Sequence, residues 1–455
     1  MKSAALVVWS ALALTADIAS AQLDRVRLAS AVDSIAAAAL SGGKAAGMSI
    51  AVVRARDTLV LRAYGKADLE LDVPTPDRAV YEIGSVTKQF TAASILQLAE
   101  QGKLSLDDEI TKYFPKYPVH GYHVTIRRLL DHTSGIPGYT EIPEFWPIST
   151  RSLPRDSLVA MFGAKPFDFP PGTAMSYSNS AFFLLGLLIE KTSGQPYEQY
   201  VSQHLFQPAG MVDSRYCSTS VVVPRRAHGY DVKDDTLRLA AYIDMTWPYS
   251  AGSLCSTAGD LVAWTHALHT GTILSPASYH EMITPGTLAD GTRLRYAKGL
   301  AIDSLDGHRR ISHGGGIPGF LSTVQYFPDD SLTVVVLVNS AGPVSPDGIA
   351  RAIVDLALGD KPAPPAAFHG TLGDYAGTYS GIARGGKETI RITVDSGGRS
   401  LMFHPAHGSA TSVAYYGTDT FGHDEMRLRF VRTAGRVGTV RLDEVYGYNL
   451  LKRDP

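Results

Sequence analysis

The chain has 455 residues, of which 45% are apolar and 19% are charged, a balance typical of a globular protein with at least one large core. Its length leaves room for a second, smaller domain. The formal net charge is -2 and no clustered Lys/Arg face is evident, which argues against nucleic acid as a partner.

The first 21 residues have the pattern of a secretory signal peptide. Lys2 supplies a short basic end, residues 4–16 an apolar core, and residues 19–21 (Ala-Ser-Ala) a small-residue cleavage site. We therefore expect a mature chain that begins at Gln22 and is secreted or periplasmic. The alternative is an uncleaved membrane anchor.

After removal of the signal peptide we expect no stable membrane span. The next longest apolar run, residues 181–189, is too short to cross a bilayer and indicates a buried helix.

Helical and strand-like patterns then alternate in a defined order. The expected elements are a helix over 24–40, a hairpin of strands 48–53 and 58–64, helices and loops over 85–269, a second hairpin of strands 321–327 and 332–338, and a helix over 349–358. This order predicts an α+β fold in which an antiparallel sheet is flanked by helices and a separate helical region packs beside it. Ser85 would then lie in a cleft between the two.

A proline-rich segment separates this part of the chain from the rest. Residues 361–371 read as a linker between a domain over 22–360 and a second domain over 372–455. Short alternating runs such as 390–394 and 426–430 predict a small all-β barrel for the second domain.

Ser85 and Lys88 are the first candidates for chemistry. Residues three apart on a helix share a face, so the hydroxyl of Ser85 and the amine of Lys88 would meet at the start of the helix that follows Gly84. Helix N-terminal N–H groups would stabilise an oxyanion there and lower the pKa of Lys88. Ser41 and Lys44 have the same spacing, but two glycines place them in a turn.

Two further motifs supply polar groups that such chemistry needs. Tyr177 precedes a buried helix, and its phenol, with a lowered pKa beside an ammonium, could relay a proton to a leaving group. Asn179 could donate hydrogen bonds to both substrate and Lys88. The structural alternative is a tyrosine and an asparagine that cap the helix.

The third motif is His313-Gly314-Gly315-Gly316. It precedes the late hairpin and is predicted to form an edge-strand segment whose missing side chains let a substrate backbone approach.

Ser85-x-x-Lys88, Tyr177-x-Asn179 and His313-x-Gly315, in this order, resemble the three motifs of the class C β-lactamase and penicillin-binding-protein family of serine hydrolases. The resemblance extends over residues 25–358, and the last domain resembles the lipocalin-like barrel that some relatives carry.

The resemblance implies a role for each residue. Ser85 would be the acylated nucleophile and Lys88 with Tyr177 the general-base system. Asn179, His313 and Gly315 would contact substrate, and the backbone N–H groups of Ser85 and Gly316 would form the oxyanion hole. No cofactor or metal is implied.

His-Gly-Gly replaces the Lys-Thr-Gly of true class C β-lactamases, and a largely neutral histidine is a weaker partner for a substrate carboxylate than lysine. The implied function is hydrolysis of an amide, a β-lactam or an ester through an acyl-enzyme, on a small-molecule or peptide substrate. The alternative is a non-catalytic protein that binds or senses penicillins or peptidoglycan peptides.

Two other groups of residues call for interpretation. Cys217 and Cys255 are the only cysteines, and export would permit a disulfide between them, although two buried thiols would satisfy the sequence equally. Asp131, His132 and Ser134 stand too close together for a catalytic triad and are interpreted as parts of a structural turn.

Overall fold

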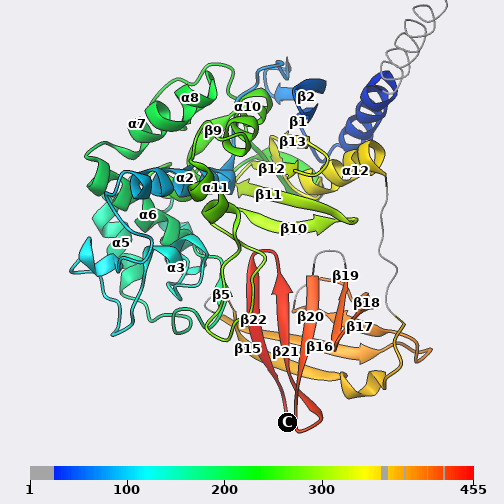
Figure 1. The fold of residues 1–455 in the computed structure, drawn as a ribbon. Coiled ribbons are helices and arrows are strands. Elements are labelled where there is room, and N and C mark those ends of the chain that lie inside the picture. The colour runs from blue at the N-terminus through cyan, green and yellow to red at the C-terminus, as the bar shows by residue number, and fades with distance from the viewer. Residues whose placement is uncertain (1–24, 360–366, 384–385, 407, 424–425) are drawn as a thin grey trace, which may run out of the picture.

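The computed structural model describes residues 25–359, 367–383, 386–406, 408–423 and 426–455. The predicted signal peptide and most of the predicted linker lie outside these residues. Among the described residues, no helix combines the length and the apolar character that crossing a bilayer would need. Figure 1 shows a mixed helix and sheet region next to a β-barrel formed by the C-terminal part of the chain.

The centre of the first region is a seven-stranded antiparallel sheet. In spatial order its strands are β10 (Ala301–Leu305), β11 (His308–Ile317), β12 (Phe320–Phe327), β13 (Leu332–Val338), β1 (Gly47–Arg54), β2 (Asp57–Asp68) and β3 (Val73–Pro74). Both predicted hairpins are confirmed, and β1 pairs with β13 so that the two hairpins lie side by side. All seven residues of β13 are buried, as expected for a β-branched central strand.

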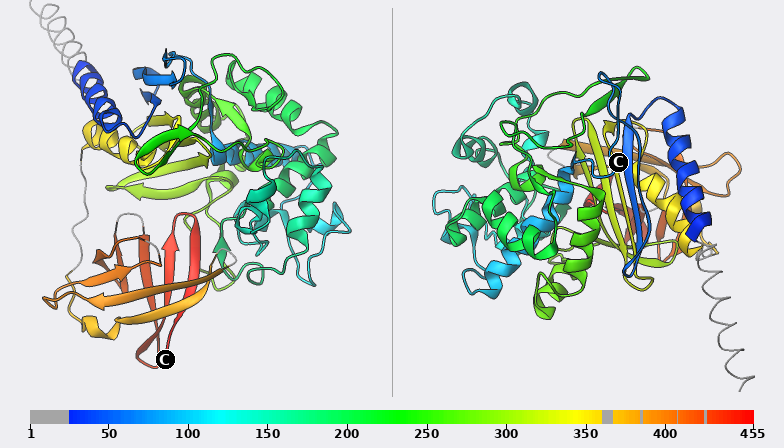
Figure 2. Two further views of the ribbon diagram at one scale, coloured as in Figure 1. Left: turned by 180° about the vertical axis from the view of Figure 1, so that it is seen from behind. Right: turned by 90° about the horizontal axis from the view of Figure 1, so that it is seen from above.

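Helices cover both faces of this sheet (Figure 2, right). On one face, the helix of residues 25–41 and α12 (Pro346–Leu358) pack on alternate residues of β1 and β13, among them Ile50 and Val334. On the other face, Ala51 and Val335 contact the core that holds α2 (Thr87–Glu100) and α10 (Ala258–His269). Successive side chains of each strand point to opposite faces of the sheet, so the strands contribute to two separate cores.

The helical region lies beside the sheet and is built around α6 (Asn179–Ser193). The Ser178 hydroxyl caps its N-terminus by accepting a hydrogen bond from Ala181 N, and Gly194, at φ 75°, ends it. The other helices of the first region are α3 (Ile126–Leu130), α4 (Phe145–Ile148), α5 (Arg155–Gly163), α7 (Tyr197–Val201), α8 (Gln207–Ala209), α9 (Tyr249–Gly252) and α11 (Pro276–Ile283). Its short turns are η1 (Gly84–Val86), η2 (Ile110–Lys112), η3 (Tyr139–Glu141) and η4 (Ser202–Phe206).

Two small three-stranded sheets complete this part of the fold. One has the order β4 (Tyr81–Glu82), β9 (Leu254–Ser256), β6 (Arg215–Tyr216), and the other β14 (Ser340–Ala341), β7 (Tyr230–Lys233), β8 (Thr236–Leu239). The first matters for the site because β4 leads directly into Ser85. A disulfide joins Cys217 to Cys255 across it, with the Cα atoms 5.2 Å apart.

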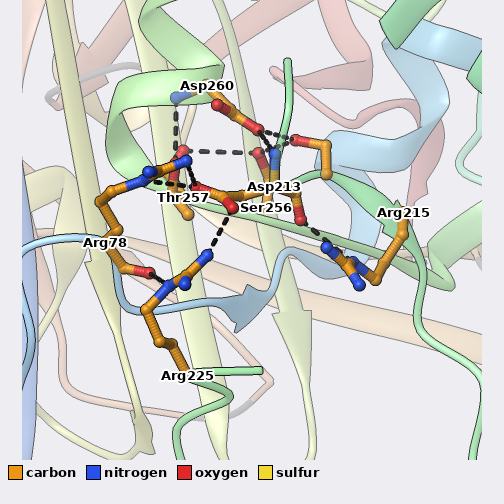
Figure 3. Close-up of polar contacts among 8 residues, drawn as sticks. Arg78, Asp213, Arg215, Arg225, Ser256, Thr257 and Asp260 are labelled. Carbon is orange, nitrogen blue, oxygen red and sulfur yellow. Dashed lines mark hydrogen bonds and ion pairs between the residues drawn. The ribbon is translucent and has the colours of Figure 1, made fainter. Parts of the chain in front are cut away.

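Ion pairs reinforce the same sheet. The buried Asp213 carboxylate binds both Arg78 and Arg225, and its backbone N donates to Asp260 at the start of α10 (Figure 3). The two arginines come from different segments, so one buried carboxylate holds together the chain around Arg78, just before β4, around Asp213 and around Arg225.

The C-terminal residues form a closed eight-stranded antiparallel barrel, as predicted. A short turn, η5 (Leu372–Asp374), precedes the strands β15 (Gly377–Ala383), β16 (Gly386–Val394), β17 (Leu401–His404), β18 (Thr411–Gly417), β19 (Thr420–His423), β20 (Met426–Thr433), β21 (Arg436–Glu444) and β22 (Gly447–Arg453), with β15 pairing β22 to close the ring. Aromatic side chains such as Tyr375 and Tyr379 fill its core.

The barrel is hydrogen-bonded into the first region, which the sequence did not predict. Strand β22 also pairs with β5 (Met175–Ser176), the two residues that precede Tyr177. An ion pair of 3.0 Å between Arg295 and Asp443 joins the same two parts. The barrel is therefore a neighbour of the candidate site.

Candidate active site

Ser85 and Lys88 meet at the start of α2, as their spacing predicts. Ser85 lies in the turn η1, and Lys88 Nζ is 3.2 Å from its Oγ. The same nitrogen is 2.8 Å from Asn179 Oδ1 and 2.8 Å from the carbonyl oxygen of Ala251. Ser41 and Lys44, which have the same spacing, do not contact each other in this way. The Ser41 hydroxyl donates to a carbonyl of its own helix, and Lys44 forms an ion pair with Asp235.

Lys88 is fully buried, and this burial lowers its pKa well below the usual value for lysine. The direction agrees with the sequence prediction, and the largest cause is the desolvation of the ammonium. A neutral amine has two N–H bonds and one lone pair. With the N–H groups directed at Asn179 and Ala251, the lone pair is left for the Ser85 hydroxyl.

Close packing of Gly84 against Gly316 brings the two predicted oxyanion donors to one place. Gly84 has φ 50°, and a Cβ there would lie 2.9 Å from Gly316 N. A side chain at position 84 would therefore separate η1 from β11. The arrangement can place the N–H groups of Ser85 and Gly316 on the same substrate oxygen.

Tyr177 is positioned by the segment between β5 and α6. Its ring lies 4.6 Å from Lys88 Nζ and 4.3 Å from the ring of His132. His132, which has φ 60°, accepts a hydrogen bond from Ser178 N through Nδ1. The turn around His132 is thus structural, as predicted, and it also fixes the backbone beside Tyr177.

Asn179 contacts Lys88, but as an acceptor and not as the donor that was expected. Its Nδ2 donates instead to Thr140 Oγ1 at 3.1 Å. The side chain therefore orients the amine of Lys88 and is itself held from η3.

His313 is buried and both of its ring nitrogens contact protein groups. Nδ1 lies 2.6 Å from the carbonyl oxygen of Gly314, and Nε2 lies 2.9 Å from Tyr296 Oη. Burial lowers the pKa of His313 to about 3, so the ring is neutral at physiological pH. In this structure the one N–H and the one lone pair of the neutral ring are both used in these two internal contacts, whereas the resemblance implies that His313 contacts substrate.

The His-Gly-Gly-Gly segment lies on a partly open edge of β11. Strand β10 pairs with β11 only as far as Ser312, so residues 313–317 have no strand on that side. The strand is therefore not the outer strand of the sheet, but its second half has a free edge. At Gly315 the missing side chain makes room for the carbonyl oxygen of Ile83 rather than for substrate.

Tyr446, from the turn between β21 and β22 of the barrel, fills part of that free edge. Its hydroxyl accepts a hydrogen bond of 3.0 Å from Gly314 N. Its ring lies 5.4 Å from that of Tyr177 and 5.3 Å from that of His313. No local pattern in the sequence points to this residue, because only the tertiary pairing of β22 brings it to the site.

Ser85 lies between two pockets. One is a pocket of about 430 Å³ with Tyr177, His313, Tyr446 and Asp347 among its lining residues. The other is smaller, about 200 Å³, and includes Asn179 and, from the helical region, Tyr139, Phe145 and Trp146. Tyr177 lines only the larger pocket and Asn179 only the smaller one. The two pockets can therefore hold different halves of a substrate.

Comparison with known proteins agrees with this geometry. The family described as Beta-lactamase matches residues 32–358, which is more than half of the chain. The chain belongs to the Beta-lactamase family. It is a serine hydrolase of β-lactamase fold, and its relatives include penicillin-binding-protein-like proteins and D-aminopeptidases.

Three relatives of this Beta-lactamase family member illustrate the range. The putative penicillin-binding protein PbpX of Bacillus subtilis (strain 168) is 29% identical over 289 residues, 64% of this chain and 69% of PbpX. A D-aminopeptidase of Brucella anthropi is 29% identical over 327 residues, 70% of this chain and 60% of its own length. The octameric penicillin-binding protein homologue from Pyrococcus abyssi is 26% identical with a TM-score of 0.63, over 93% of this chain and 99% of that one.

Proposed function

We propose that the protein is an exported serine hydrolase that forms an acyl-enzyme on Ser85 and transfers the acyl group to water. The observation that carries this proposal is the buried Lys88 amine 3.2 Å from Ser85 Oγ, with its pKa lowered and its N–H groups directed elsewhere. Relatives named D-aminopeptidase and D-amino acid amidase support amides as substrates. Esters and β-lactams react by the same chemistry.

In the first half-reaction, Ser85 Oγ attacks the substrate carbonyl carbon while its proton passes to Lys88 Nζ. The N–H groups of Ser85 and Gly316 stabilise the oxyanion of the tetrahedral intermediate. The bond to the leaving nitrogen or oxygen then breaks, and the proton reaches that atom through Tyr177. The product is the Ser85 ester and a free amine or alcohol.

In the second half-reaction, water takes the place of the leaving group. It gives one proton to the Lys88 and Tyr177 pair and attacks the ester carbon, and the proton returns to Ser85 Oγ as the acid product leaves. The serine and the lysine end in their starting protonation states.

The test is covalent labelling of the purified, folded protein with a fluorophosphonate or a β-lactam, followed by peptide mass spectrometry. We expect one adduct on Ser85, and loss of both adduct and hydrolysis in Ser85→Ala. Ser41→Ala is the matched control, because it removes the hydroxyl of the other Ser-x-x-Lys sequence. This variant should be labelled and should hydrolyse substrate as the wild type does. Hydrolysis that survives in Ser85→Ala contradicts the mechanism, and a folded protein without an adduct supports the non-catalytic alternative.

Export is tested separately by N-terminal sequencing of the protein recovered outside the cytoplasm. A mature chain that begins at Gln22 is expected. A full-length N-terminus on membrane-bound protein would favour the uncleaved anchor.

A further inference from the structure

The larger of the two pockets beside Ser85 has an unexpected charge. Among the described residues that line it there is no lysine or arginine, and its histidine, His313, is neutral and internally bonded. Asp347 is its one acidic residue. A substrate carboxylate in this pocket would meet a carboxylate and no compensating cation, whereas a positively charged group would meet its counter-ion.

The Asp347 carboxylate is held in a fixed orientation. It lies in the first turn of α12, and its Oδ1 accepts hydrogen bonds from Thr323 Oγ1 at 2.7 Å and from Gln325 Nε2 at 3.0 Å. Both donors belong to β12 and are completely buried, while Asp347 itself is exposed. Two rigid partners on a central strand therefore aim an accessible carboxylate, which is the arrangement that a binding residue needs.

The other carboxylate oxygen lies near Gly314 of β11. A methyl group built on Gly314 would lie 3.8 Å from Asp347 Oδ2 and 3.6 Å from Tyr446 Oη. The two oxygens thus border the same space, one from the sheet and helix region and the other from the barrel. The absence of a side chain at Gly314 keeps that space open.

We propose that Asp347 and Tyr446 form a subsite for a cationic group of the substrate, an ammonium or a guanidinium. The proposal rests on the acyl-enzyme function proposed for Ser85 and adds a substrate class to it. Asp347 supplies the negative charge, and the Tyr446 hydroxyl oxygen faces the same space. Asp347 acts as a specificity-determining residue, because it faces the substrate without taking part in bond making or breaking.

The cation could belong to either half of the substrate, and two matched substrate series distinguish these sources. In the acyl series, phenylalanine p-nitroanilide is compared as the free amine, the N-acetyl and the N-succinyl compound, in both enantiomers. In the leaving-group series, the phenylacetyl ester of choline is compared with its neutral isostere, the 3,3-dimethylbutyl ester. Within each series the scissile bond is constant and the charge is varied.

We expect the wild-type enzyme to prefer the cation over the neutral compound in one series by about tenfold or more in kcat/KM, the scale of one ion pair in a partly enclosed site. In Asp347→Asn this preference should fall to within about twofold of unity. The change should appear as a higher KM for the cationic substrate, with its kcat and the values for the neutral substrate kept.

Asp156→Asn is the matched control. Asp156 also lies in the first turn of a helix, α5, and is exposed, but it does not border either pocket beside Ser85. This variant should keep the wild-type preference. A charge effect that is general to helix N-termini would instead appear equally in both variants and would overturn the proposal.

Labelling of Ser85 separates the two levels of inference. If an enzyme that labels at Ser85 shows no preference for the cation in either series, or if Asp347→Asn keeps the preference, the subsite is wrong and the acyl-enzyme mechanism stands. If Ser85 does not label, the mechanism itself fails. The wild-type comparison needs no variant, so a folding defect in Asp347→Asn leaves the test decisive.

Discussion

Tyr446 and Gly314 are 132 positions apart in the chain, yet the tyrosine hydroxyl accepts a hydrogen bond of 3.0 Å from the glycine nitrogen. Gly314 N and Gly316 N share an edge of β11, since residues two apart in a strand point the same way. The barrel therefore occupies one backbone donor of the edge that also carries a predicted oxyanion donor.

Tyr446→Phe should release the Gly314 N–H to substrates. A neutral hydrogen bond contributes about 1 kcal/mol, so we expect KM to fall up to about fivefold for substrates with an additional carbonyl group near the scissile bond, with kcat unchanged. Steady-state kinetics on a short and an extended amide would measure this. Tyr448→Phe is the control, since its hydroxyl accepts from Arg441 instead. Both amides are uncharged, so that the proposed cation subsite plays no part, and a KM that rises for them in Tyr446→Phe would contradict this prediction.

Gly84→Ala should impair the chemical step. The added Cβ would lie 2.9 Å from Gly316 N and push apart the two oxyanion donors, for which we expect a loss of about 10²-fold or more in kcat. Gly102→Ala shares the positive φ, 69° against 50°, but has open space around the new Cβ. It should lose stability of about 1 kcal/mol and keep kcat. Equal losses of kcat in both variants would mean that backbone strain, not the oxyanion geometry, is responsible.

Stability should fall as the pH is lowered from about 6.5 toward 3. Burial lowers the pKa of both His313 and His269 to about 3 in the folded protein. Between that value and the ordinary histidine pKa of ~6.5 the unfolded chain binds protons that the folded chain excludes, so acid favours unfolding by about 1 kcal/mol per pH unit for each such histidine. Above pH 6.5 both histidines are neutral in the folded and the unfolded chain, so they no longer reduce the free energy of unfolding.

Urea unfolding at pH 7 and pH 5 would check this dependence. In His313→Gln, the free energy of unfolding should fall less on acidification, by about 1 kcal/mol per pH unit, which is the effect of one buried histidine. In His280→Gln, at an exposed position on α11, the fall should be the same as in the wild type. An unaltered pH slope in His313→Gln would show that the ring is already protonated in the folded state.

Local sequence pattern predicted those parts of the site that depend on neighbours in the chain. The Ser85 and Lys88 contact follows from helix geometry, and the two hairpins and the barrel strands follow from period-2 alternation. Tyr177, Asn179 and His313 were placed by resemblance, because nothing local says that three distant segments converge.

Other features depended on tertiary contacts that carry no sequence signal. Strand β5 has only two residues, too few for any periodic pattern, and its partner β22 lies beyond a predicted linker. Tyr446 was missed for this reason. Asp347 was missed because an acidic residue in the first turn of a helix is an ordinary feature, and its role depends on the buried Thr323 and Gln325 that orient it. The neutral state of His313 likewise depends on Tyr296 and on burial.

The pairing of β22 with β5 also affects the order of events during biosynthesis. Gly447 and Tyr448, which pair with Ser176 and Met175 just before Tyr177, are made after all the other site residues of the first region. While a ribosome still encloses these residues, the nascent chain has Ser85 and Lys88 but neither β22 nor Tyr446 in place. The site is therefore expected to become complete only once β22 has been made and has paired with β5, so a partly made or C-terminally clipped molecule would carry the nucleophile in an unfinished pocket.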